Sequence, residues 1–139
     1  MGKKVNEKFI SAYAELDKTC CTKFGISTGG LTEYINRLNN ARFAPKRDDV
    51  LPRLVKYRNI RNIFAHEAKE LKKSDDITKV DIAWLNKFNK DVIKKKDPYS
   101  AYLKKARRYA RGRRLKRYAV VFGILAVAVA AVVLYFVLK

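Results

Sequence analysis

Histidine and cysteine are scarce in this 139-residue chain, which has one histidine and two cysteines. The two cysteines, Cys20 and Cys21, are adjacent, and disulfide geometry disfavours a bridge between neighbours. The sequence therefore predicts no disulfide framework, which suits a reducing compartment. With so few ligands available, no credible zinc-binding set exists. We expect no metal and no cofactor.

Acidic residues are also scarce, and their distribution is uneven. The chain has 32 Lys and Arg against 13 Asp and Glu. Residues 1–99 hold 22 of the basic and all 13 acidic residues, a charge of +9, whereas residues 100–139 hold 10 basic residues and no acid, a charge of +10. Such an excess of positive charge favours a polyanionic partner, either nucleic acid or an anionic membrane surface.

Charge is absent from residues 118–138, YAVVFGILAVAVAAVVLYFVL. As a helix, these 21 residues would span about 31 Å, close to the hydrocarbon thickness of a bilayer. The alternative is a buried core helix, but so small a domain has no interior able to surround this run on every side. The sequence predicts a single transmembrane helix at 118–138, with Tyr118 and Tyr135 at interfacial positions.

The segment before this run, residues 100–117, is strongly basic and contains no acid. Positive charge resists translocation, so we expect a single-pass tail anchor whose N-terminal domain faces the cytosol. The segment either binds anionic lipid headgroups or serves only as a topology signal, and both interpretations stay open. The headgroup-binding candidates are Lys104, Lys105, Arg107, Arg108, Arg111, Arg113, Arg114, Lys116 and Arg117.

The first half of residues 1–99 predicts two helices. Apolar residues recur at three- and four-residue steps over residues 4–23, and Gly25 stops this helix. A second, shorter helix starts at Leu31 and is broken by Asn39-Asn40 and Pro45. The expected apolar faces hold Val5, Phe9, Tyr13, Leu16 and Cys20, then Leu31, Tyr34, Ile35 and Leu38.

The second half of this region predicts two more helices. Asp48 or Asp49 caps the third, and Ser74-Asp75-Asp76 opens the fourth, which ends at Asp97-Pro98. No run alternates in the way a strand would, so we expect an all-α domain over residues 1–99. The expected apolar faces hold Leu51, Leu54, Val55, the stem of Arg58 and Ile63 or Phe64, then Val80, Trp84, Leu85, Phe88 and Val92.

The single histidine lies in the stretch RNIFAH, residues 61–66. On a helix, Asn62 and His66 share a face, and Arg61 and Arg58 can reach the same patch. A histidine beside two guanidiniums stays near neutral and can accept a proton, and guanidinium matches phosphate oxygens in a bidentate manner. These groups would suit an RNA phosphodiester, whose 2′-hydroxyl proton the histidine would take.

A structural interpretation of the same stretch is also open. A lone histidine near a helix C-terminus is favoured by the helix dipole, and Asn and Arg are ordinary on a helix surface. By chemistry alone this interpretation is favoured, because one histidine rarely makes a site.

The stretch resembles the HEPN family, small all-helical domains named for higher eukaryotes and prokaryotes nucleotide-binding. The family's hallmark is Arg, four to six residues, then His, often with Asn directly after the Arg, and Arg61, Asn62 and His66 match these three places. The resemblance covers roughly residues 5–97, although RNIFAH is its only specific motif. This sequence departs from the family pattern at Glu67, where many family members have a small residue.

The resemblance implies a four- or five-helix up-down bundle that forms a homodimer. Two motifs would then face each other and form a composite, metal-independent ribonuclease site. His66 would be the general base or acid, Arg61 the phosphate clamp and Asn62 an orienting group, with Arg58 a candidate for substrate contact.

The sequence thus predicts a membrane-tethered endoribonuclease of a defence or toxin type, with RNA as substrate and an antitoxin or other protein as a possible partner. The alternatives are a non-catalytic membrane adaptor and an RNA-binding module without cleavage. The predicted domains are 1–99, the helical domain; 100–117, a basic helix; and 118–138, the transmembrane helix.

Overall fold

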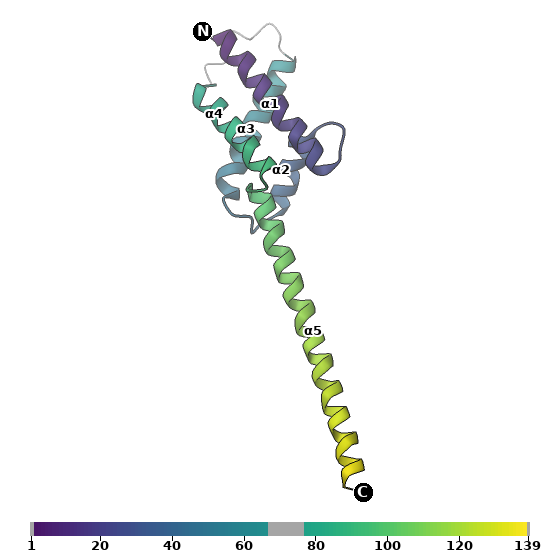
Figure 1. The fold of residues 1–139 in the computed structure, drawn as a ribbon. Helices are drawn as coiled ribbons and strands as arrows, with labels where there is room; N and C mark the ends of the chain where they lie inside the picture. The colour runs from purple at the N-terminus through teal and green to yellow at the C-terminus, as the bar shows by residue number, and fades with distance from the viewer. Residues whose placement is uncertain (1, 67–76, 139) are drawn as a thin grey trace. The chain divides into compact units, whose positions relative to one another are not determined.

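A computed structural model describes residues 2–66 and 77–138, with the side chains of residues 2, 3 and 66 outside the description. In this part of the chain every regular element is a helix (Figure 1). The predicted all-α fold, a helical bundle followed by one long C-terminal helix, is confirmed. The helices are α1 (Gly2–Phe24), α2 (Gly30–Asn40), α3 (Arg47–His66), α4 (Lys79–Ile93) and α5 (Pro98–Val137).

The chain divides into two compact units, Met1–Tyr102 and Leu103–Lys139. Unit 1 is the helical bundle and includes the first turn of α5, whereas unit 2 contains the rest of that helix. Helix α5 continues without a break through the basic segment and the apolar run, as the sequence predicted. The predicted domain boundaries after residues 99 and 117 stay predictions.

Helix α1 lies at the centre of unit 1 and packs against α2 and α4, while α3 packs mainly against α2. The apolar stripes predicted for α1 and α2 are confirmed, because Phe9, Leu16, Leu31, Tyr34 and Leu38 are all fully buried. Their spacing of three and four residues places them on one face of each helix. The core of unit 1 is therefore built on α1.

Aromatic rings fill the spaces between these helices. Phe9 of α1 makes edge contacts with Tyr57 and Phe64 of α3, at ring-centroid distances of 5.8 and 6.2 Å. Trp84 and Phe88 of α4 stack with their centroids 5.1 Å apart. Such rings bury much apolar area each, which lets a small bundle form a continuous core.

The predicted start of α4 was wrong. The helix begins at Lys79 after Thr78, whose hydroxyl accepts a hydrogen bond from the Asp81 backbone N–H while the Asp81 carboxylate accepts one from the Thr78 N–H. This reciprocal capping box satisfies two backbone donors, so it defines the first turn. The predicted cap, Ser74-Asp75-Asp76, lies outside the described residues.

Two of the predicted apolar faces also need correction. Val80 is 74 % exposed and falls in the first turn of α4, before the buried positions Leu85 and Phe88. On α3, Phe64 is half-buried while Ile63 is exposed, and the buried positions include Tyr57 and Ile60, which the prediction omitted. Tyr57 enters the core because its hydroxyl donates to Asp81, 2.8 Å away.

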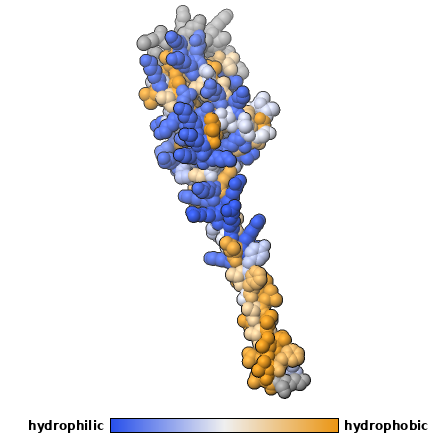
Figure 2. Space-filling view, in the orientation of Figure 1, coloured by the Kyte–Doolittle hydropathy of each residue, from blue (hydrophilic) through white to orange (hydrophobic). Residues whose placement is uncertain are grey.

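In unit 2, α5 is exposed from Lys104 to its end (Figure 2). Its first part is hydrophilic and its second part is hydrophobic, with Val120, Phe122, Leu134 and Phe136 all exposed. Among the described residues, this is the one helix long and apolar enough to cross a membrane. None of its apolar window is buried inside the protein, which distinguishes it from the core helix considered as the alternative.

Gly30 marks a close approach between α1 and α2. A Cβ added there would clash with the backbone of Asp17 and Cys21, which cannot move without displacing α1. Gly30→Ala should therefore lower the free energy of unfolding by about 1 to 3 kcal/mol, the usual effect of overpacking. Gly112→Ala is the matched control, because nothing lies within 4 Å of that position in α5. Denaturant unfolding checks this, and equal stability of the two variants would contradict the close approach.

Candidate functional site

The residues of RNIFAH lie in the last turns of α3. Arg61 and Asn62 are exposed, and Arg61 Nη1 donates to Asn62 Oδ1 at 3.5 Å. Arg58, one turn earlier, is partly buried. His66 is the last residue of α3, but its side chain lies outside the described part of the structure. The structure thus places two of the three motif side chains on the surface and leaves the geometry of the third a prediction.

Arg61 borders two adjoining hollows on α1. One, of about 580 Å³, is lined by Asn6, Glu7, Ile10, Ser11, Arg61, Phe64 and Ala65. The other, of about 290 Å³, is lined by Ile10, Tyr13, Ala14, Asp17, Lys18, Cys21, Ser27 and Arg61. A ligand held by Arg61 would therefore lie beside α1, and these α1 residues were not identified from the sequence.

Both arginines act electrostatically on Tyr13 of α1, and Arg61 lines a hollow together with it. Burial raises the pKa of Tyr13 to about 12, and Asp17 adds to this effect, while Arg61 and Arg58 oppose it through their positive charges. The positive charges of both guanidiniums therefore reach the neighbourhood of Tyr13. A phosphate placed there would meet two cations from one helix.

The predicted headgroup-binding residues all lie on α5 within unit 2 and are exposed. Their nine side chains are distributed between positions 104 and 117 and include no acidic neighbour. Among the described residues no acidic side chain forms an ion pair with this segment, so its charge is available to a polyanion.

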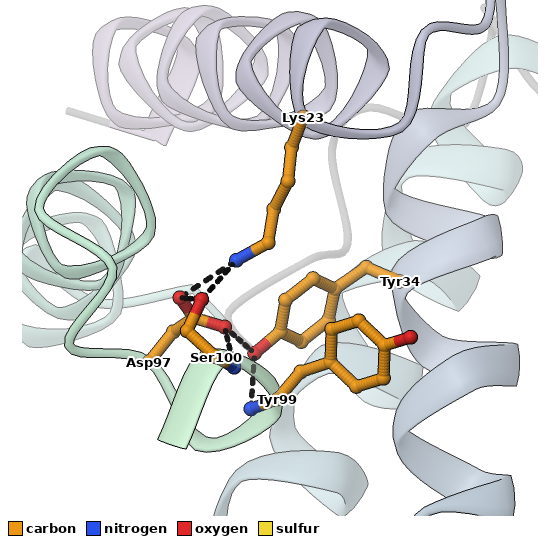
Figure 3. Close-up of polar contacts among 5 residues, drawn as sticks. All are labelled: Lys23, Tyr34, Asp97, Tyr99 and Ser100. Carbon is orange, nitrogen blue, oxygen red and sulfur yellow. Dashed lines mark hydrogen bonds and ion pairs between the residues drawn. The ribbon is translucent and has the colours of Figure 1, made fainter. Parts of the chain in front are cut away.

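A second cluster, which sequence reasoning missed, surrounds Asp97 (Figure 3). The Asp97 carboxylate is buried and accepts hydrogen bonds from Lys23 Nζ at 2.7 Å, Tyr34 Oη at 2.7 Å and Ser100 Oγ at 2.6 Å. The Ser100 backbone N–H also donates to it at 3.1 Å. Lys23 comes from the end of α1, Tyr34 from α2 and Ser100 from the first turn of α5.

This arrangement makes Asp97 the N-cap of α5. Its backbone carbonyl accepts the first intrahelical bond from Ala101, and Pro98 occupies the first helical position, where no N–H is needed. The sequence signal was present in Asp97-Pro98, which we interpreted as the end of the preceding helix. The pairing with Lys23 and Tyr34, 74 and 63 residues away, has no local signal.

Burial alone would raise the pKa of Asp97, but the hydrogen bonds from Lys23, Ser100 and Tyr34 outweigh it and hold the pKa below its ordinary value. Burial and the adjacent carboxylate raise the pKa of Tyr34, which therefore stays a neutral donor. The cluster is fully hydrogen-bonded and fastens three helices together. We assign it a structural role.

The cysteines and acidic residues form no further site in the described residues. Burial raises the pKa of Cys20 to about 12, so this thiol stays protonated and unreactive. Within residues 2–66 and 77–138, no three side chains of the metal-binding types gather in one place.

Comparison with known proteins gives one match. Residues 7–120 match the model of a family of unknown function, DUF6548. The matched region includes most of the bundle, the whole basic segment and the beginning of the apolar run. No curated protein and no solved structure matches the chain.

The Asp97 cluster predicts that two aspartates contribute very different amounts to the free energy of unfolding. Asp97→Ala should destabilise the protein by about 3 to 5 kcal/mol, because it leaves a cation without its partner in a buried site and removes a helix cap. Asp97→Asn should cost less, because an amide still caps. Asp48→Ala is the control, since Asp48 is exposed and its ion pair with Arg47 should contribute about 0 to 1 kcal/mol.

Because the pKa of Asp97 is lowered in the folded protein, the contribution of Asp97 to the free energy of unfolding depends on pH. It is complete above the ordinary carboxyl pKa of about 3.9 and is lost as the pH falls through the lower folded value. The difference in unfolding free energy between wild type and Asp97→Asn should shrink in this acidic range. A difference that stays constant with pH would contradict the assignment.

Proposed function

We propose that this chain, which belongs to the family of unknown function DUF6548, is anchored in a membrane by α5 and holds its helical bundle at the cytosolic surface. The supporting observation is the order of residues along one exposed helix. Nine cations without an acid are followed directly by 21 uncharged residues, and none of the apolar window is buried. A fully apolar, unburied surface of this length needs a hydrocarbon environment.

The orientation follows from the position of the charge. Lys and Arg beside a transmembrane helix stay on the cytosolic side. The basic segment immediately precedes the apolar run, so the bundle would lie in the cytosol. The same cations would contact anionic phospholipids, each contributing about 1 kcal/mol near the surface.

A second candidate function concerns RNA. We propose that the bundle cleaves RNA without a metal, with His66 as acid–base group, Arg61 as phosphate clamp and Asn62 as orienting group. The observation that favours this proposal is the exposure of Arg61 and Asn62 in the last turns of α3, beside open hollows on α1. Arg58 adds a cation one turn away. The resemblance to the HEPN family implies that a second copy completes the site, in a defence or toxin role.

The competing interpretations are an RNA-binding module without cleavage and a non-catalytic adaptor that recruits a protein. In either case the exposed cations of α3 remain available for binding, but His66 has no chemical role. A variant of this histidine therefore separates cleavage from the other two.

Membrane topology provides the first test. A glycosylation acceptor appended after Lys139 should be modified when the full chain is inserted into microsomes, because this end would reach the lumen. The same acceptor placed before Met1 should stay unmodified, since the bundle remains outside. Modification of the N-terminal acceptor would reverse the proposed orientation.

RNA cleavage provides the second test. The full chain in detergent should cleave RNA in the presence of EDTA and leave 2′,3′-cyclic phosphate ends, whereas DNA, which lacks the 2′-hydroxyl, should resist. His66→Ala and Arg61→Ala should each lower the rate by about 10²-fold or more. Lys56→Ala, which removes another exposed cation of α3, is the matched control and should retain activity. Unchanged cleavage in His66→Ala would exclude the proposed mechanism, and strictly monomeric active protein would exclude a composite site.

A further inference from the structure

Unit 1 has an unusual surface at the end where α5 begins. The α2–α3 connection and the α4–α5 turn both lie at this end (Figure 1). Phe43 in the first connection is 85 % exposed, and Ile93 at the end of α4 is 62 % exposed. Exposed cations flank both. We call this surface the cationic end, and it consists of Arg42, Phe43, Lys46, Ile93, Lys94, Lys95 and Lys96.

The exposure of Phe43 is imposed by the fold. Its neighbours Ala41 and Ala44 are buried, and the Ala44 N–H donates to the Ala41 carbonyl at 2.9 Å. Arg47 closes the connection by donating to the carbonyls of Leu38 and Asn39, at 3.3 and 3.1 Å. The backbone is therefore held on both sides of Phe43, which directs the ring into solvent. A large ring held outward in this way suits contact with an apolar phase.

Two lysines of the cationic end adopt left-handed backbone conformations, Lys46 at φ 56° and Lys95 at φ 55°. Lys95 follows the end of α4 in a turn where Lys95 N–H donates to Val92 and Lys96 N–H to Asp91, the hydrogen-bond pattern that usually has glycine at this position. Glycine would avoid the strain at both sites. The chain has lysine at both positions instead. This places two cations beside the exposed apolar residues and lowers the stability of the fold.

The charge at this end is mostly uncompensated. The acidic residues nearest to Lys46 in sequence are Asp48 and Asp49, and Asp48 is already paired with Arg47 at 2.8 Å. Lys94, Lys95 and Lys96 have no ion pair among the described residues. The combination of a protruding aromatic ring, an exposed aliphatic side chain and surrounding ammonium groups matches a membrane interface, where rings enter the headgroup boundary and cations bind lipid phosphates.

We propose that the cationic end docks on an anionic phospholipid surface, with Phe43 and Ile93 entering the headgroup region. This inference rests on the proposed membrane anchoring by α5 and adds a second contact, made by the bundle itself. The surface lies where α5 begins, and that helix leads to the proposed anchor. A nucleic acid would use the cations but would not require an aliphatic side chain held outward beside them.

Docking sets a condition on the basic segment. A helix over residues 103–117 is about 22 Å long, so its first part must run along the headgroup layer when the bundle is docked. Its cations lie on every side of the helix, which allows such a position. Gly112 lies within this segment without a neighbouring side chain and is the weakest point of the helix, where a bend costs least.

The experiment uses the full chain reconstituted in vesicles. Trp84, the only tryptophan, is replaced in Trp84→Phe, and a reporter is introduced by Phe43→Trp. Lipids with brominated chains quench an indole that enters the bilayer. We expect strong quenching in phosphatidylcholine vesicles that contain phosphatidylglycerol and weaker quenching in pure phosphatidylcholine. Val80→Trp with Trp84→Phe is the matched control, because Val80 is also largely exposed, at 74 %, but lies in the first turn of α4, at the opposite end of that helix from Ile93.

A second variant separates docking from stability. Lys46→Gly combined with Lys95→Gly, added to the reporter protein, removes two charges and relieves the strain at both positions. Its melting temperature should rise, yet the docking constant should fall by about 25-fold, about fivefold for each cation. Lysines with a purely structural role would show no loss of quenching.

Three results would overturn the inference: equal quenching at positions 43 and 80, equal quenching in both vesicles, or a response at position 43 to added RNA but not to anionic lipid. The last result would assign the surface to nucleic acid. Resistance of the same samples to alkaline extraction reports membrane insertion by α5 separately. Failure of docking in inserted protein therefore overturns this inference alone.

Discussion

The buried Asp97 carboxylate is the constraint on which unit 1 depends most. A single side chain accepts bonds from α1, α2 and α5 and also caps the helix that continues into the basic and apolar segments. Burying a carboxylate is costly unless its oxygens are satisfied, and here each oxygen has a partner. Because the partners come from three helices, these helices must be in place together for the charge to be stable inside the protein.

This constraint explains how the rest of the charge is distributed. Among the described residues, Asp97 is the only buried charged side chain, so every described lysine and arginine side chain is at least partly exposed. Cys20 and Tyr34 pack around the cluster and hold protons tightly, which leaves no reactive group in this part of the core. The surface features to which we assign proposed roles are the last turns of α3, the cationic end and α5. The proposed functions all use these surfaces and leave the core unchanged.

Much of the helical fold could be predicted from the sequence because it depends on local periodicity. The apolar stripes of α1 and α2 follow a three- and four-residue spacing that a helix turns into one face. The continuous α5 follows from an uncharged run and a basic segment that contain no proline. The beginning of α4 could not be predicted, because several capping residues lie near one another in sequence and the reciprocal bonds of Thr78 and Asp81 decided between them.

Features that depend on contacts between residues far apart in the sequence could not be predicted from it. Nothing near Asp97 indicates that Lys23 will neutralise it, and nothing near Tyr57 indicates that its hydroxyl will find Asp81. The exposure of Phe43 has the same origin, since it depends on the burial of Ala41 and Ala44 and on the hydrogen bonds of Arg47 to the end of α2. The motif side chains show the opposite case: the positions of Arg61 and Asn62 follow from helix geometry, whereas the proposed chemistry of the site depends on His66.

The central claim is that the apolar half of α5 resides in a bilayer and thereby holds the bundle at a membrane. Alkaline extraction of membranes from cells that express the full chain tests it most directly. The account predicts that the protein stays in the membrane pellet, while a variant with Val127→Lys and Ala130→Lys, which places two charges in the middle of the run, is released. Release of the unaltered chain would contradict the account, because a surface-bound basic protein dissociates under these conditions and an inserted helix does not.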